Sequence, residues 1–207
     1  ELFPLFTEEV RKLAESNPAA ALSILTDSLD KKDIQIWSRN ETTQAALRRL
    51  GVAGEMIKTS GDYLSVITAN VGGGKTDGVV AETINHTAQV SVGSVRETVT
   101  ITREHNGKRG NIRTGHQNIS YVRVYVPENA RLISARGFTA PESYRFERPD
   151  ISLEPDPDVR FEESGAQIDP ESGTEIWQES GKTVFGHWLS VKAGETAIAE
   201  LTYELPL

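Results

Sequence analysis

A change in hydrophobic period at Tyr63 is the feature that most constrains the fold of this chain. From there on, apolar residues recur at every second position, as they do in strands with one buried face. Between residues 79 and 92, for example, Val80, Ile84 and Val90 share one parity, and mostly polar residues occupy the other. Further strands are predicted at 95–103, 121–126, 131–136, 174–178, 183–191 and 196–205. Six to eight short strands without a long helix predict an immunoglobulin-like antiparallel β-sandwich.

The first 60 residues follow helical spacing instead. Thr7 is predicted to cap a first helix, and Asn17 followed by Pro18 predicts the start of a second. A third helix is expected between a cap at Asn40 and a stop at Gly51. The buried face of this third helix is expected to comprise Ala46, Leu47 and Leu50.

The two patterns divide the chain into two parts. A short apolar run at 34–37 alternates like a strand among the helices, so residues 1–77 are predicted to form a small mixed α/β segment. Residues 78–207 are predicted to form the sandwich, which makes the fold mainly β. Because the chain starts at Glu1, inside a helical pattern, we expect the smaller segment to be the tail of a larger domain.

Composition argues against several classes of function. A net charge of -8 disfavours binding to nucleic acid, which needs basic surface, and to anionic membranes. The absence of cysteine excludes disulfides, thiol catalysis and thiolate zinc sites. No stretch approaches the roughly 18 apolar residues of a membrane-spanning helix. Membrane contact is therefore expected only through a segment outside this chain.

Residues 69–76, ANVGGGKT, nearly match the phosphate-binding loop of nucleotide-binding proteins. In such a loop Lys75 would contact the phosphates and Thr76 would hold Mg²⁺. That chemistry requires a helix directly after the loop. Here Asp77-Gly78 predicts a turn, and the residues that follow alternate with the period of a strand. We therefore expect a glycine-rich crossover, with nucleotide binding as the less favoured alternative.

Several segments, in order, resemble the bacterial family named domain of unknown function 4012. They are 34–44, 47–54, 61–77, 121–128, 134–139 and 181–186, followed by Glu195 and the terminal Tyr203-Glu204-Leu205-Pro206. The resemblance implies an envelope protein with an N-terminal membrane helix, a large extracytoplasmic α/β region and a C-terminal β-sandwich. It implies no catalytic residue. The larger region of such proteins has a faint similarity to enzymes that transfer lipid-linked glycans to the cell wall.

Positive charge gathers at residues 103–116, where Arg103, Lys108, Arg109 and Arg113 suggest a patch for phosphate or an anionic glycan polymer. A solvated hairpin tip is the plainer interpretation of the same charges. These residues are the candidate ligand-binding residues of the chain.

Residues 139–173 are acidic and rich in proline, glycine and serine, which predicts a long loop or a ragged edge strand. Calcium is an alternative use of the carboxylates at Asp150, Asp156, Asp158, Glu162, Glu163, Asp169, Glu171 and Glu175. The residue order of a dedicated calcium loop is missing, however. His86 and His187 fall on inward parity and are expected to be buried and hydrogen-bonded.

The four histidines lack the spacing of a catalytic zinc site, and no activated serine motif occurs. We therefore predict no catalytic residue, no metal and no cofactor. The expected function is that of a non-catalytic, extracytoplasmic structural or interaction module of a bacterial envelope protein. Its expected partner is an envelope glycan or another envelope protein. The alternative is an accessory domain of a glycan-transfer enzyme that binds an anionic polymer through the basic loop.

Overall fold

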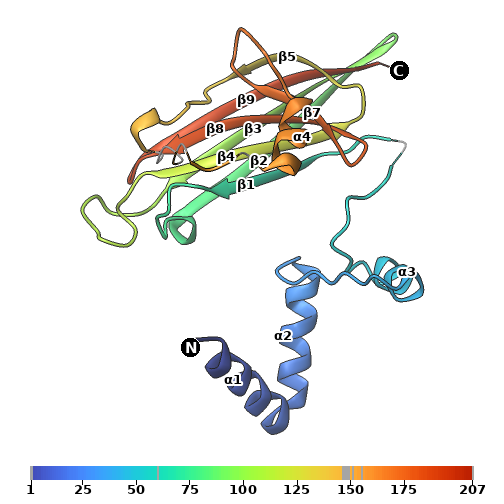
Figure 1. The fold of residues 1–207 in the computed structure, drawn as a ribbon, viewed down its shortest axis with the longest axis vertical. Coiled ribbons are helices and arrows are strands. Elements are labelled where there is room, and N and C mark those ends of the chain that lie inside the picture. The colour runs from blue at the N-terminus through green and yellow to red at the C-terminus, as the bar shows by residue number, and fades with distance from the viewer. Residues whose placement is uncertain (1, 60, 146–149, 151, 155, 207) are drawn as a thin grey trace. The chain divides into compact units, whose positions relative to one another are not determined.

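The computed structural model describes residues 2–59, 61–145, 150, 152–154 and 156–206. The chain divides into two compact units, the first ending at Ile57 and the second beginning at Lys58. All nine strands of the described residues lie in the second unit (Figure 1). The predicted boundary at residue 78 thus falls inside the second unit, because β1 (Ser65–Asn70) pairs with a strand of the sandwich.

The first unit consists of α1 (Leu2–Ser16), α2 (Pro18–Asp30), α3 (Glu41–Arg49) and their connections. Asn17 caps α2 as predicted, since its Oδ1 accepts a hydrogen bond from the Ala20 amide at 3.1 Å. Asn40 caps α3 in the same way, with the Thr43 amide donating at 3.0 Å. The predicted cap at Thr7 is wrong, because α1 already contains that residue and its hydroxyl donates to the Pro4 carbonyl.

The buried residue of α3 is polar. Gln44 is 2% exposed, accepts a hydrogen bond from the Ser38 amide and donates one to Glu55. The prediction that Leu50 is buried is wrong, since 73% of it is exposed, and Ala46 is exposed as well, whereas Leu47 is half-buried. The run 34–37 contributes one isolated parallel bridge, between Ile36 and Ala53, instead of a strand.

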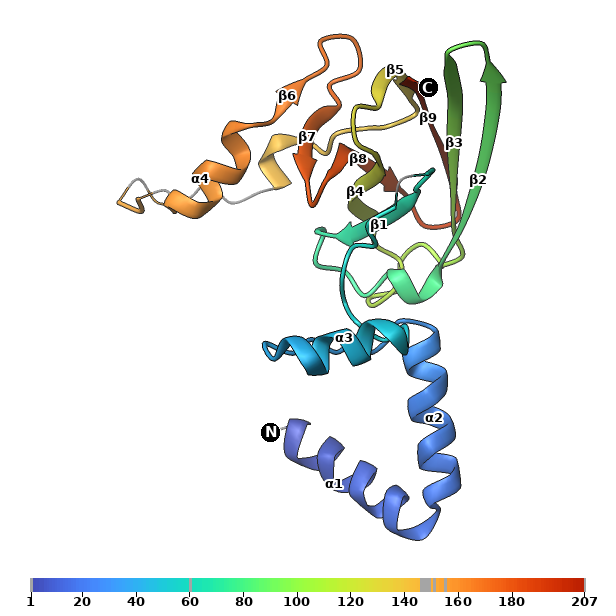
Figure 2. The ribbon, with the colours of Figure 1, turned by 90° about the vertical axis from the view of Figure 1, so that its right-hand side faces the viewer.

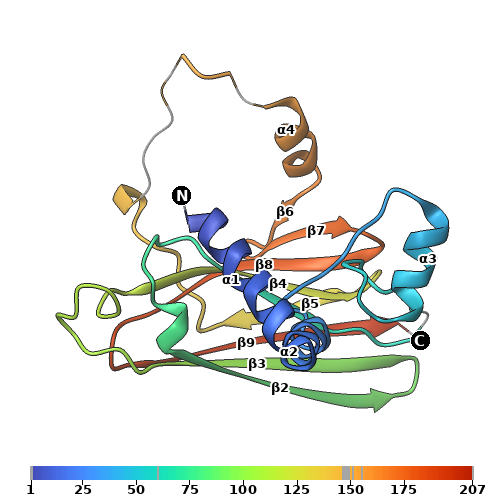
Figure 3. The same cartoon turned by 90° about the horizontal axis from the view of Figure 1, so that it is seen from below.

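The second unit is an antiparallel β-sandwich, as predicted. Its other strands are β2 (Val80–Ser91), β3 (Ser94–His105), β4 (Asn118–Pro127), β5 (Arg131–Arg136), β6 (Gln167–Ile168), β7 (Glu175–Glu179), β8 (Lys182–Val191) and β9 (Thr196–Pro206). A five-stranded sheet has the order β1-β4-β8-β7-β6, and a four-stranded sheet has the order β2-β3-β9-β5. Figure 3 shows the two sheets as separate layers.

The core lies between these sheets and is built from one parity of each strand. On β4, Val122, Val124 and Val126 are at most 1% exposed. The four-stranded sheet covers them with Val99 and Ile101 from β3 and with Ala199, Leu201 and Tyr203 from β9. Burying each large side chain of this kind contributes about 1.5–3 kcal/mol, so the alternation is what stabilises the sandwich.

The strand β2 departs from this pattern. It pairs with β3 along its full length, yet all of its residues after Val80 are exposed. Figure 2 shows the two strands as a long hairpin. The residues of β2 that were predicted to face inward do share one face, but Ile84 is 40% exposed and Val90 is 77% exposed. The periodicity reports which side chains share a face, whereas coverage by the other sheet depends on where that sheet ends.

The acidic region 139–173 is mostly connection, as predicted. Among its described residues are a 3₁₀ turn (Ser143–Arg145), the helix α4 (Pro157–Ser164) and the two-residue edge strand β6. None of the helices among the described residues is both long and apolar enough to span a membrane.

Candidate functional site

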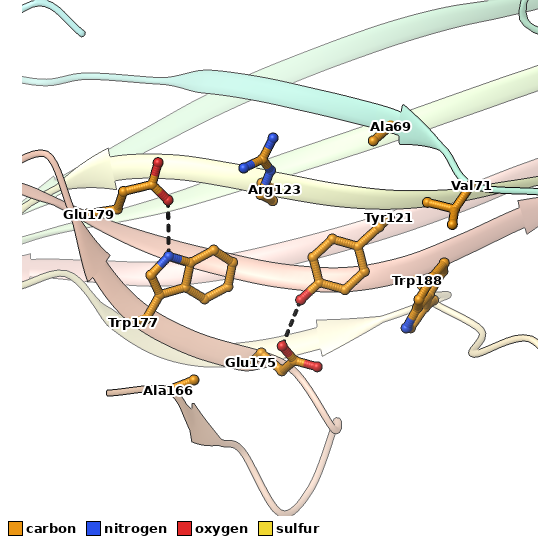
Figure 4. Close-up of a pocket in the computed structure, with 9 residues that line it drawn as sticks. All are labelled: Ala69, Val71, Tyr121, Arg123, Ala166, Glu175, Trp177, Glu179 and Trp188. Carbon is orange, nitrogen blue, oxygen red and sulfur yellow. Dashed lines mark hydrogen bonds between the residues drawn. The ribbon is translucent and has the colours of Figure 1, made fainter. Parts of the chain in front are cut away.

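The outer face of the five-stranded sheet carries a cleft of about 650 Å³ that we call the aromatic cleft. It is lined by Ala69, Val71, Tyr121, Arg123, Ala166, Glu175, Trp177, Glu179 and Trp188 (Figure 4). Strand register brings these residues together, because directly opposed residues of an antiparallel pair share a face. Tyr121 lies opposite both Ala69 and Trp188, and Glu175 lies opposite Gly186.

Alternation along β4 separates the core from the cleft. Its valines point into the sandwich, so Tyr121 and Arg123 are on the outer face. The rings of Tyr121 and Trp188 meet edge to face, with centroids 5.0 Å apart and planes at 74°. This is a favourable arrangement for aromatic pairs, and it holds both rings in place.

Gly186 makes room for the other side of the cleft. A Cβ atom at this position would lie 2.3 Å from the Tyr121 hydroxyl and 2.6 Å from Cζ3 of Trp177. Both distances are far below van der Waals contact. The absence of a side chain on β8 therefore allows the indole of Trp177 and the phenol of Tyr121 to lie against the strand.

The polar atoms of the rings are anchored to carboxylates at the edge of the cleft. Tyr121 donates to Glu175 at 2.9 Å, and the Trp177 indole N–H donates to Glu179 at 3.1 Å (Figure 4). Tyr125, buried beneath, donates to the same Glu179 carboxylate at 3.1 Å. Burial, together with the hydrogen bond to Glu175, raises the pKa of Tyr121 well above its ordinary value. The phenol therefore stays a hydrogen-bond donor at every physiological pH.

Arg123 supplies the positive charge of the cleft. It is half-buried, and its guanidinium lies 5.9 Å from the centroid of the Tyr125 ring. No carboxylate of the described residues forms an ion pair with it. The aromatic cleft thus combines three aromatic rings, two carboxylates and a guanidinium with free donors.

The structure separates the predicted basic patch into two parts. Arg103 lies in β3, not in the loop, and is 4% exposed. Its Nη1 donates to Asn118 and Ser120 at 2.8 Å, and its Nε lies 3.1 Å from a Glu82 carboxylate oxygen. Burial lowers the pKa of Arg103, while the charges of Glu82 and Asp77 oppose that change. Arg103 is thus enclosed by protein partners.

The other predicted cations stay on the loop. Lys108, Arg109 and Arg113 are exposed. Arg109 forms an ion pair with Glu195 and also donates to the Ala193 carbonyl, which holds the loop against the turn before β9. The exposed loop therefore offers Lys108 and Arg113 as the cations without an ion pair to any described carboxylate.

The glycine-rich crossover has the surroundings that its sequence predicts. A three-residue 3₁₀ turn (Asp77–Val79) follows it, and then β2 begins. Thr76 is fully buried, and its hydroxyl accepts hydrogen bonds from Asn70 and Asn118 at 3.3 and 2.9 Å. Lys75 is exposed. The Thr76 hydroxyl, which would have to hold Mg²⁺ in a phosphate-binding loop, is thus sequestered in the interior.

The two histidines on inward parity differ in burial. His187 is half-buried, stacks on Phe138 and contacts the Ser172 carbonyl at 2.8 Å. His86 is hydrogen-bonded, as expected, and its partner is Glu97. The residue as a whole is exposed, because β2 is not covered, although its side chain is only 25% exposed.

The proposed calcium ligands do not form a cluster of donor atoms among the described residues. Asp169 instead accepts hydrogen bonds from the amide and the hydroxyl of Ser172 within a turn, and these bonds lower its pKa. Asp150 caps its own turn by accepting from the Ser152 amide. The side chains of Glu162 and Glu163 lie outside the described residues.

The sequence does contain a signal for the aromatic cleft, although no sequence motif marks it. Tyr121 and Trp188 occupy the alternate, solvent-facing positions of strands whose other positions are strongly apolar. Trp177 occupies the same kind of position on the strand between the turns at residues 173 and 181. Large aromatic side chains on the solvent parity of strands that become neighbours indicate a binding face. Which strands become neighbours could not be read from the sequence.

Comparisons of the chain with models of protein families, with curated proteins and with solved structures give no match. The function of the aromatic cleft is therefore inferred from the chemistry of the residues that line it.

Proposed function

We propose that the second unit is a non-catalytic saccharide-binding module of a bacterial envelope protein, and that the aromatic cleft is its binding site. The observation that carries the proposal is the set of three aromatic rings around one cleft. Glu175 and Glu179 fix the polar atoms of Tyr121 and Trp177, and Trp188 packs edge to face on Tyr121. Rings held in place in this way bind a ligand with little loss of side-chain entropy.

A sugar ring matches the cleft chemically. The C–H bonds on one face of a pyranose form an apolar surface that packs on an indole or phenol, while its hydroxyl groups need hydrogen-bond partners at the edge. Glu175 and Glu179 retain acceptor capacity, and Arg123 retains donors. With two carboxylates and one guanidinium, the cleft favours a neutral sugar over a polyanion.

The same carboxylates are poorly arranged for hydrolysing the sugar. Glu175 and Glu179 project from the same face of one strand, four residues apart. Glycosidases instead place two carboxyl groups on opposite sides of the bond that they cleave. Each carboxylate here is also held by its own aromatic donor, which supports binding without catalysis.

The extracytoplasmic location belongs to this proposal and is supported by the resemblance to domain of unknown function 4012. An envelope glycan is the ligand that both the resemblance and the cleft chemistry suggest. The net charge of -8 remains unfavourable for nucleic acid.

The test is calorimetric titration of the whole chain with neutral tetrasaccharides of N-acetylglucosamine and of glucose. At least one is expected to bind, and Trp177→Ala is expected to weaken its binding about 30-fold or more, as for the central aromatic residue of an interface. The matched control is Trp37→Ala, which removes an exposed tryptophan from the first unit and should leave affinity unchanged. Equal affinity of the Trp177 variant and the wild type would overturn the proposal.

A second candidate function rests on the basic loop, where Lys108 and Arg113 are exposed on an acidic protein. It is the binding of an anionic wall polymer. That binding should weaken as salt rises and should be lost in the Lys108→Ala/Arg113→Ala variant, while the Trp177 variant keeps it.

A further inference from the structure

We infer that Asp62, His86 and Glu97 form a site for a divalent transition metal, with Zn²⁺ as the fitting ion. The three residues come from three segments: the chain that leads into β1, strand β2 and strand β3. This site is separate from the aromatic cleft, and it does not depend on the proposed function.

The donor atoms are already gathered. One ligand atom from each residue lies within 4.8 Å of the others, and His86 Nε2 is 2.8 Å from Glu97 Oε2. Zinc binds histidine nitrogen and carboxylate oxygen at roughly 2.0–2.2 Å, so donors of a tetrahedral site are roughly 3.3–3.6 Å apart. Small side-chain rotations would bring these three atoms to that separation.

Glu97 is the residue whose environment most requires a cation. It is 2% exposed, and within the described part of the chain its only ion-pair partner is the imidazole of His86. The buried hydroxyl of Tyr203 donates to the same carboxylate oxygen, Oε2. A carboxylate held in this way by a second residue is oriented as metal ligands usually are.

The local potential is negative. The nearest ligand oxygens of the Asp62 and Glu97 carboxylates lie within 4.8 Å of each other, so two negative charges are concentrated beside one imidazole. Two carboxylates that both disfavour a third negative charge nearby would favour a dication between them.

The donor set selects the kind of metal. An imidazole with two carboxylates suits zinc, whereas magnesium and calcium take oxygen ligands in larger number. Asp62 is exposed and the His86 side chain is 25% exposed, so an ion has access from solvent. A water molecule would complete the fourth position.

Binding would connect the leading segment to the β2–β3 hairpin. Asp62 directly precedes Tyr63 and Leu64, and Leu64 packs against the core. The strand β2 lies at the edge of its sheet, where it pairs with β3 alone. A metal bound only in the folded state would therefore stabilise the second unit by mass action.

The sequence spacing of these residues hides the site. Asp62 and His86 are 24 positions apart and Glu97 follows 11 positions later, which matches no zinc motif. The prediction that the histidines bind no metal relied on motif spacing, whereas here the sheet register brings the donors together.

The test is thermal unfolding of the whole chain with ZnCl₂, MgCl₂ or CaCl₂ after treatment with a chelator. Zinc is expected to raise the melting temperature, and magnesium and calcium are not. Asp62→Asn and His86→Gln should each abolish the zinc effect, whereas His116→Gln, at an exposed histidine outside the site, should retain it.

Cobalt provides a second readout that does not depend on stability. Co²⁺ in a tetrahedral nitrogen–oxygen site gives visible absorption bands, which the wild type should show and the Asp62 and His86 variants should lack. A zinc effect that is equal in the wild type and in both variants, or no zinc effect and no cobalt bands in the wild type, would overturn the inference.

Discussion

Gly186 determines how closely the aromatic side chains of the cleft approach the sheet. A methyl group at this position would overlap the Tyr121 hydroxyl and the Trp177 indole. Both are large groups held by hydrogen bonds, so neither can move without losing its partner. The conformation of the glycine backbone is not the constraint, because Gly186 lies in a regular strand. Space alone excludes a side chain there.

We predict that Gly186→Ala lowers the stability of the protein by about 1–3 kcal/mol, as overpacking does, and opens the aromatic cleft. Denaturant unfolding measures the first effect, and a change in tryptophan fluorescence of the folded state reports the second. Gly78→Ala is the matched control, since a Cβ atom there meets nothing within 4 Å. If both variants unfold like the wild type, Gly186 does not shape the cleft.

At the scale of single residues, the sequence predicted well which face of a strand a side chain occupies, but it predicted poorly which residues surround that side chain. Ala199, Leu201 and Tyr203 are buried together on one face of β9, as their alternation indicates. Leu50 is apolar and exposed, whereas Arg103 is charged and buried. Arg103 is stabilised by the hydrogen bonds that it donates to Asn118 and Ser120 on another strand. No local sequence pattern could reveal these partners.

At the scale of elements, period-2 alternation predicted β2 to β5 and β7 to β9 to within a few residues, because side chains alternate between the two faces of a strand. The two-residue strand β6 is too short to produce a pattern. The candidate site was missed for another reason. The cleft depends on the order β1-β4-β8-β7, and β4 and β8 are separated by more than 50 residues of chain. Strand order is a property of the whole fold.

The position of β1 leads to a prediction about the limits of the sandwich. Its residues pair with β4 from Ser65–Tyr125 to Asn70–Ser120, and Val66 packs against the core. A protein comprising residues 58–207 is therefore expected to fold cooperatively. One comprising residues 78–207, which begins at the boundary predicted from the sequence, should be less stable or aggregate, because β4 becomes an uncovered edge.

Calorimetric unfolding of the two shortened proteins, compared with the whole chain, measures this difference. The decisive quantity is the melting temperature of the sandwich. Equal melting temperatures for the two shortened proteins would mean that β1 contributes little to the second unit.

At the scale of the whole molecule, three buried or half-buried tyrosines make the stability of the second unit depend on pH in the alkaline range. Burial raises the pKa of Tyr121, Tyr125 and Tyr203 above the ordinary value of about 10. The unfolded chain then releases protons at a lower pH than the folded protein does. Their contribution to stability is complete below about pH 10 and is lost as the pH rises through the folded-state values.

We therefore predict that the free energy of unfolding contributed by these tyrosines is level near neutrality and falls above about pH 10. In Tyr203→Phe the slope should be shallower by up to about 1.4 kcal/mol per pH unit, because one fewer proton is released on unfolding. Denaturant unfolding at a series of alkaline pH values, with tyrosinate absorbance recorded in parallel, measures both. An unchanged slope in the variant would contradict the assignment of Tyr203.

The sheet order also determines how the second unit would resist a pulling force. β9 lies between β3 and β5, so tension on its far end must shear two ladders at once. β1 lies at an edge and pairs with β4 alone. Under load along the chain, β1 would detach first while β9 and the core stay intact. The module is therefore mechanically asymmetric: its leading segment yields, and its trailing strand anchors.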